Sequence, residues 1–168
     1  MARGPGALLA LALLLPALGL GCASVFGTGP VRVSELTDDG DAPRRASMRL
    51  VERGLAADAA FQPSFALSRY ERAIQVDPTN PFAYLALARH SLDGGEPERA
   101  LEYLDQAEMF LQSQGQDSPR VEPHLDGLRG SALLAAGRST EGVPLLDRAR
   151  RAAPSVWGDG YLSADELR

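Results

Sequence analysis

The stretch that decides the fold is residues 77–107, DPTNPFAYLALARHSLDGGEPERALEYLDQA. It opens on Asp77-Pro78-Thr79-Asn80-Pro81, in which one proline stops a helix and the other fits the first turn of the next. The segments that follow, 81–92 and 96–111, are separated by the turn Asp93-Gly94-Gly95. We therefore predict two antiparallel helices that form a hairpin.

The pattern of large and small apolar residues in this hairpin recurs on both sides of it, at offsets of 34 and 42 residues. Small residues match small ones and large residues match large ones, as helices that cross closely require. The offset of 34 pairs Leu50 with Tyr84, Gly54 with Ala88, Ala66 with Ala100, Tyr70 with Leu104, and Ala73 with Ala107. The offset of 42 pairs Ala88 with Gly130, Gly95 with Gly137, Ala100 with Gly142, Leu104 with Leu146, and Ala107 with Ala149.

This repeat resembles the tetratricopeptide repeat (TPR) over about Ser47 to Val156. The resemblance implies an all-α solenoid of about three helical hairpins, at residues 47–80, 81–114 and 123–156 within a domain of residues 43–156. Either Asp41 or Ser47 is expected to cap the first helix. Residues 157–168, in which Ser163 and Glu166 have the spacing of a capping box, are expected to fold over the exposed end as a short cap.

The first 21 residues have the composition of a signal peptide, with Arg3 followed by the apolar run ALLALALLLPALGL at 7–20. Small residues precede Cys22, the only cysteine, which resembles the lipidated first residue of a bacterial lipoprotein. The resemblance implies a lipid-anchored protein of the cell envelope, at the outer membrane and facing the periplasm, because Ala23 follows the cysteine. The alternative is cleavage by the general signal peptidase, with Cys22 an incidental residue of the leader.

Residues 22–42 are rich in Gly, Pro, Thr and Asp, and we expect a linker there. Within it, Val31–Leu36 alternates apolar and polar residues, which predicts either a strand or a segment packed on the solenoid.

Composition excludes several classes of function. The net charge is −5 and no lysine occurs, so neither a basic nucleic-acid surface nor Schiff-base chemistry is expected. One cysteine and two histidines, His90 and His124, lack the spacing of a metal site. No nucleophile with its base and no phosphate cradle is visible either. We therefore expect no enzyme, no metal and no cofactor.

The TPR resemblance instead implies a concave groove that binds a protein or peptide. Its usual contact positions fall on a largely apolar set that suits a hydrophobic peptide or an amphipathic helix. These positions are Met48, Val51, Leu55, Phe82, Leu85, Arg89, Leu92 and Leu134, with His124, Gly127 and Ser131 beside them. The alternative is that Val31–Leu36 of the same chain, or the partner of a self-associated dimer, covers this face.

These expectations combine into a membrane-anchored, non-catalytic adaptor for envelope assembly or secretion. The alternatives are an accessory subunit that recruits a peptidoglycan or secretion enzyme, and an assembly factor resembling the pilotins of pili.

Overall fold

The structure, a computed structural model, describes residues 29–116 and 118–168 in addition to Met1. Residues 2–21 of the predicted leader, Cys22 and residues 23–28 of the predicted linker lie outside the described residues. Within the described residues, no helix combines the length and the apolar character that crossing a membrane would need.

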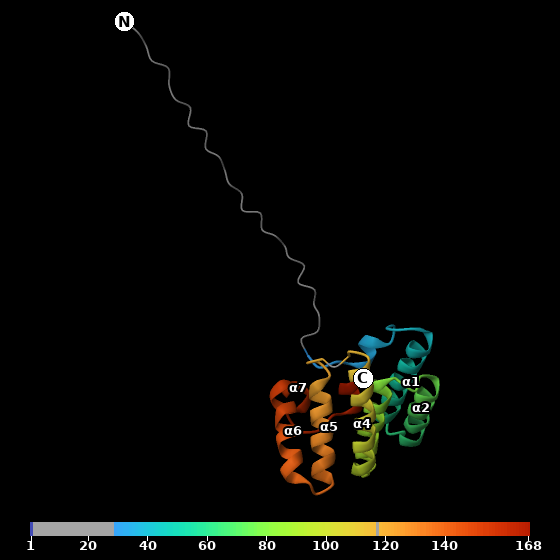
Figure 1. Cartoon of the computed structure of the whole chain (residues 1–168). Coiled ribbons are helices and arrows are strands. Elements are labelled where there is room, and N and C mark those ends of the chain that lie inside the picture. The colour runs from blue at the N-terminus through green and yellow to red at the C-terminus, as the bar shows by residue number, and fades with distance from the viewer. Residues whose placement is uncertain (2–28, 117) are drawn as a thin grey trace.

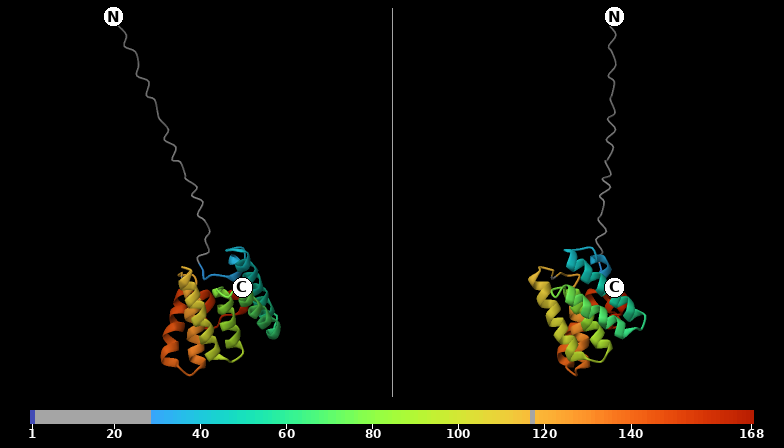
Figure 2. Two further views of the ribbon diagram at one scale, coloured as in Figure 1. Left: turned by 45° about the vertical axis from the view of Figure 1, so that its right-hand side comes forward. Right: turned by 90° about the vertical axis from the view of Figure 1, so that its right-hand side faces the viewer.

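Six helices form three antiparallel hairpins (Figure 1). The first hairpin consists of α1 (Ala42–Ala59) and α2 (Pro63–Val76), the second of α3 (Pro81–Asp93) and α4 (Pro97–Ser113), and the third of α5 (Glu122–Ala135) and α6 (Ser139–Ala152). Three shorter helices lie outside the hairpins: the 3-10 helix η1 (Val33–Leu36), α7 (Pro154–Trp157) and α8 (Ala164–Leu167). Figure 2 shows the hairpins as a stack in chain order, from blue-green to red.

Local signals set the helix starts. Asp41, and not Ser47, caps α1, because its carboxylate accepts a hydrogen bond from the backbone N–H of Arg44 at 2.9 Å. Asn80 caps α3 in the same way, through the N–H of Phe82 at 3.1 Å. Pro63 and Pro81 lie in the first turns of α2 and α3, where a missing N–H costs no helical hydrogen bond.

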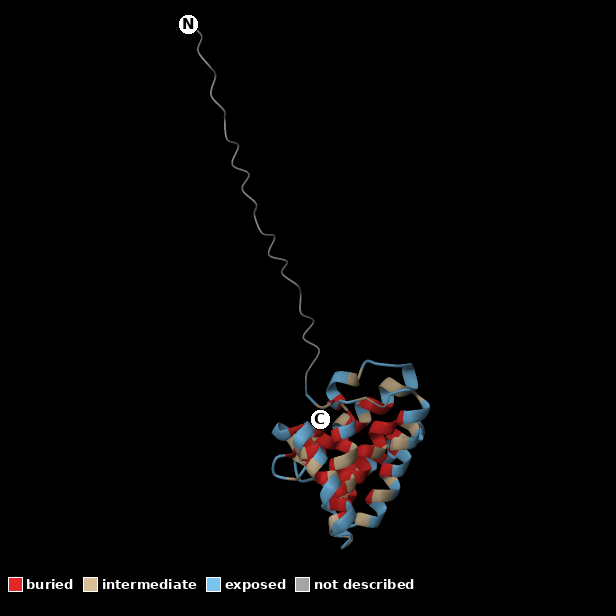
Figure 3. Ribbon diagram, turned by 60° about the vertical axis from the view of Figure 1, so that its left-hand side comes forward, coloured by how far each residue is buried: buried red, intermediate tan, exposed pale blue. Residues whose placement is uncertain are grey.

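The core lies between the helices, and the outer faces of the hairpins are exposed (Figure 3). The small residues of the repeat allow the helices to approach closely, as predicted. A Cβ on Gly130 would lie 2.7 Å from the backbone nitrogen of Leu146, and one on Gly142 would lie 2.7 Å from the carbonyl oxygen of Gly130. Glycine is therefore required at both positions of the α5–α6 contact.

Both flanking segments pack on the stack. Val31 and Val33 are buried, and the N–H of Val31 donates to the carbonyl oxygen of Arg120 at 3.0 Å. Val31–Leu36 is therefore a packed segment with a 3-10 turn and not a strand. The sequence predicted that the C-terminal residues would cover the outer end of the third hairpin. The structure shows that they do not. They return along the stack until α8 contacts α1 in the first hairpin.

Candidate functional site

The first helices of the hairpins, α1, α3 and α5, pack in that order, and their shared inner face is the predicted groove. Six of its eight predicted residues are almost fully buried: Met48, Val51, Leu55, Phe82, Leu85 and Arg89. The other two, Leu92 and Leu134, are partly buried and pack against the core. The expectation of an exposed groove is therefore wrong, and the role of these residues in partner binding stays a prediction.

The chain itself covers the inner face, and it does so chiefly with its C-terminal residues, which the sequence predicted to lie over the end of the stack. We call Pro154–Arg168 the C-terminal segment. Its apolar side chains Trp157, Leu162 and Leu167 are all buried in the same core as the groove residues. Val31–Leu36, the covering segment that the sequence had suggested, adjoins it: the N–H of Ser34 donates to the carbonyl oxygen of Arg168 at 2.8 Å.

Trp157 occupies the third hairpin's part of the face. A Cβ on Gly127 would lie 2.3 Å from Cε2 of Trp157, so the indole packs directly on the backbone of α5. The ring also lies near that of His124, with 6.4 Å between the ring centroids. Gly127 is the counterpart of Val51 and Leu85 in the first two repeats, and the missing side chain is what makes room for the indole.

Further along, the segment crosses the second hairpin. The hydroxyl of Tyr161 donates to Oδ1 of Asp93 at 3.1 Å, and the hydroxyl of Ser131 donates to the carbonyl oxygen of Gly160 at 3.4 Å. A cavity of about 200 Å³ remains beneath it. Residues from α3, α5 and the C-terminal segment line this cavity: Arg89, Leu92, Asp93, Leu128, Ser131, Trp157, Gly160, Tyr161 and Leu162.

Arg89, the one charged residue of the predicted groove, is only 2% exposed and is paired with acids. Its Nη1 lies 2.7 Å from Oδ2 of Asp93, and its Nη2 donates to Asp58 of α1. Asp58 also accepts from the hydroxyl of Tyr70 at 2.9 Å, and Nδ1 of His90 lies 3.0 Å from its Oδ1. These groups join the first two hairpins to each other beneath the C-terminal segment.

The electrostatics of this cluster favour the ionised carboxylate. Burial alone would raise the pKa of Asp58, but the hydrogen bond from His90 and the charge of Arg89 outweigh it and hold the pKa below its usual value. Burial, together with the negative charge of Asp58, raises the pKa of Tyr70. Tyr70 therefore stays a neutral hydrogen-bond donor, and the cluster is an ion network that joins the two hairpins.

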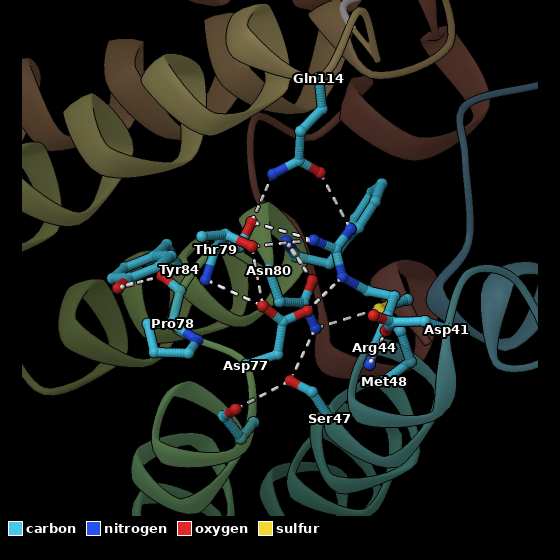
Figure 4. A network of polar contacts seen from close by, with 12 residues as sticks. Asp41, Arg44, Ser47, Met48, Asp77, Pro78, Thr79, Asn80, Tyr84 and Gln114 are labelled. Atoms are coloured by element: carbon cyan, nitrogen blue, oxygen red, sulfur yellow. Dashed lines mark hydrogen bonds and ion pairs between the residues drawn. The ribbon is translucent and has the colours of Figure 1, made fainter.

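A second network joins the same two hairpins at their other end and is built on the turn 77–81 (Figure 4). Arg44 pairs with Asp77, and its Nη1 donates to Oε1 of Gln114 at 3.0 Å. Nδ2 of Asn80 donates to Oγ of Ser47 at 2.9 Å, and Ser47 in turn donates to the carbonyl oxygen of Ala73. Burial would raise the pKa of Asp77, but the hydrogen bonds from Arg44 and Thr79 hold it below its usual value.

Among the residues that the structure describes, no group of three or more His, Cys, Asp or Glu side chains is arranged so that it could hold a metal ion. His124 is buried, with Nε2 at 2.9 Å from the carbonyl oxygen of Val31. Two features of the site were not predicted from the sequence: the path of the C-terminal segment and the ion network of Arg89. Gly127, where the other repeats carry Val51 and Leu85, was the available signal for the first.

Comparisons with known proteins agree with this architecture. A family model described as tetratricopeptide repeat matches residues 59–121, which run from the end of α1 to the residue before α5. Among solved structures, the N-terminal domain of stress-induced protein-1 (STI-1) from C. elegans is similar, with a TM-score of 0.57 and 17% sequence identity. That similarity covers 76% of this chain and 98% of the other. No curated protein matches the sequence. The predicted fold is confirmed as a TPR-type solenoid of three helical hairpins.

Proposed function

We propose that this chain is a lipid-anchored, non-catalytic adaptor that holds a protein partner in envelope assembly or secretion. The observation that carries the proposal is the inner face of α1, α3 and α5, on which a segment of peptide lies with its apolar side chains buried. A surface that takes up Trp157, Leu162 and Leu167 has the chemistry needed to bind an apolar peptide.

Anchoring is proposed from the sequence of the leader and from Cys22. Several acyl chains on one residue would hold the protein at a membrane stably. The test is the incorporation of radiolabelled fatty acid into the wild type and into Cys22→Ser. Label in the wild type alone supports the anchor, whereas label that persists in Cys22→Ser, or that never appears, rejects it.

The adaptor role needs a test at exposed positions, because substitutions at Leu55 or Phe82 would disrupt the core. A photo-crosslinking residue in place of Tyr161, which is 51% exposed beside the inner face, is expected to capture one or a few discrete proteins in cells. The same residue in place of Met109, which is 48% exposed on α4, is the matched control and should capture none of them. If exposed positions over the whole surface give no specific product, the adaptor role is rejected.

The identity of the captured protein then separates the alternatives. A peptidoglycan or secretion enzyme would indicate an accessory subunit, and a pore or barrel component would indicate an assembly factor.

A further inference from the structure

The C-terminal segment has the pattern of a bound peptide. Its large buried side chains Trp157, Leu162 and Leu167 follow one another at steps of five, and the small Ala164 is buried beside them. Of the acidic residues between them, Asp159 and Asp165 are exposed and Glu166 is half-buried. The segment therefore buries its large apolar side chains and leaves two of its carboxylates in solvent. It reaches from the end of α6 to α1, so it covers all three hairpins.

Few polar contacts hold this segment on the inner face. Among the described residues, its hydrogen bonds to helices α1–α6 are those of Gly160 with Ser131, at 3.4 Å, and Tyr161 with Asp93, at 3.1 Å. The bond from Ser34 to Arg168 joins it to the N-terminal segment. The capping box of α8 joins Ser163 and Glu166, and both of these residues belong to the C-terminal segment itself. Apolar burial therefore supplies most of the docking free energy.

The fit is also incomplete. Nε1 of Trp157 and Nε of Arg89 are both buried, and neither has a hydrogen-bond partner among the residues that the structure describes. Leaving a buried donor without a partner destabilises the docked state. A ligand with phenylalanine at the position of Trp157 would fill most of the same space over Gly127 without burying an unpaired N–H.

We propose that the C-terminal segment is a displaceable occupant of the partner groove. The partner that replaces it carries an aromatic residue followed by two leucine-like residues at steps of five. This inference rests on the proposed adaptor function and names its partner and its control. Because the segment is covalently attached, its effective concentration is of millimolar order. It therefore raises the apparent Kd of the partner by a factor equal to the inverse of the fraction of time it is undocked.

The sole tryptophan of the chain reports this displacement directly, because Trp157 is fully buried when the segment is docked. The probe is a synthetic peptide of residues 154–168 with phenylalanine at the position of Trp157, so that it adds no tryptophan signal. Titration into the wild type is expected to give a saturable red shift of Trp157 emission. A peptide with serine at its three apolar positions is the control and should give none.

Two variants test the mechanism. Ser163→Ala removes the cap of α8, so the probe should bind about fivefold more tightly, the effect of losing one helix cap. Ser113→Ala, which removes an exposed hydroxyl at the end of α4, is the matched control and should bind like the wild type. Ser34→Cys/Arg168→Cys is chosen to lock the segment by a disulfide, because the N–H of Ser34 donates to the carbonyl oxygen of Arg168 at 2.8 Å. With Cys22→Ser as background, the oxidised form should show no red shift and the reduced form should regain it.

The outcomes separate this inference from the adaptor function. Displacement of the segment is rejected if the red shift persists in the oxidised lock. It is also rejected if no variant shows a red shift while cross-links from Tyr161 persist in cells. Neither result rejects the adaptor function. Light scattering decides the remaining case. If the unliganded chain forms a dimer that the oxidised lock abolishes, the occupant is the segment of a second copy and the proposed partner is wrong.

Discussion

The indole of Trp157 packs directly on the backbone of Gly127, where a Cβ would lie 2.3 Å from Cε2 of the ring. A side chain at position 127 would therefore overlap the ring of Trp157. The absence of a side chain at Gly127 makes room for the indole on the third hairpin. The first two repeats carry Val51 and Leu85 at the same position.

Gly127→Ala is therefore expected to destabilise the protein by about 1–3 kcal/mol through overpacking. In an exposed helix interior the same change would stabilise by about 1 kcal/mol. The measurements are urea unfolding and the emission maximum of Trp157, which should move to the red. Gly94→Ala is the control, because its Cβ would lie at an ordinary 3.5 Å from the carbonyl oxygen of Ser91. Wild-type stability in Gly127→Ala would contradict the contact.

Arg89→Met is expected to lower the free energy of unfolding by about 3–5 kcal/mol. The change leaves Asp58 buried with one partner fewer, and an uncompensated buried charge is costly. Arg138→Met removes an arginine whose pair with Glu141 is exposed, so it should have no measurable effect. Urea midpoints of the two variants and the wild type give the comparison. Equal midpoints for both variants would show that the Arg89 network contributes no more than a surface pair.

The repeat and its hairpins could be predicted from the sequence because they depend on local signals. Prolines, glycine turns and small residues at fixed offsets specify where a helix begins, where it ends and which face is crowded. Gly130 and Gly142, matched by the repeat, do lie where α5 and α6 approach most closely. The capping box of Ser163 and Glu166 also forms as its spacing predicts.

The path of the C-terminal segment depends on contacts between residues far apart in the chain, which no local signal reports. The spacing of Trp157, Leu162 and Leu167 indicates an apolar side but not the surface that receives it. Arg89 illustrates the same limit, since it looked like a groove cation and instead pairs with Asp58, 31 residues earlier. Repeat matching gives the helices, and only packing shows which face is already filled.

Asn80→Ala is expected to lower the free energy of unfolding by about 1–3 kcal/mol. Asn80 is fully buried, caps α3 through the N–H of Phe82, and donates to Ser47 across the hairpin interface. Asn80→Ser keeps a cap acceptor without the amide donor, so its loss should be smaller. Thermal unfolding of the three proteins measures the order. If both variants lose equally, the bond to Ser47 and not the cap is the dominant contribution.

His124 is expected to make the stability of the fold depend on pH. Burial lowers the pKa of its imidazole below the usual 6.5, and the hydrogen bond to the carbonyl oxygen of Val31 offsets only part of that effect. Nε2 must carry the proton to donate to that oxygen, and Nδ1 is buried without a partner among the described residues. Protonating Nδ1 would place a charge between Val31–Leu36 and the C-terminal segment.

The sign follows from proton binding. Below about pH 6.5 the unfolded chain binds a proton at His124 that the folded chain does not, so stability is lost as the pH falls. The loss is at most about 1.4 kcal/mol per pH unit for one group. Asp58 and Asp77, whose folded pKa values lie below 3.8, act mainly at lower pH. His124→Gln keeps a donor for Val31 but does not titrate. Urea unfolding at about pH 7.5 and pH 5.5 should therefore show a smaller loss in His124→Gln than in the wild type, and an equal loss in both would place the acid sensitivity outside His124.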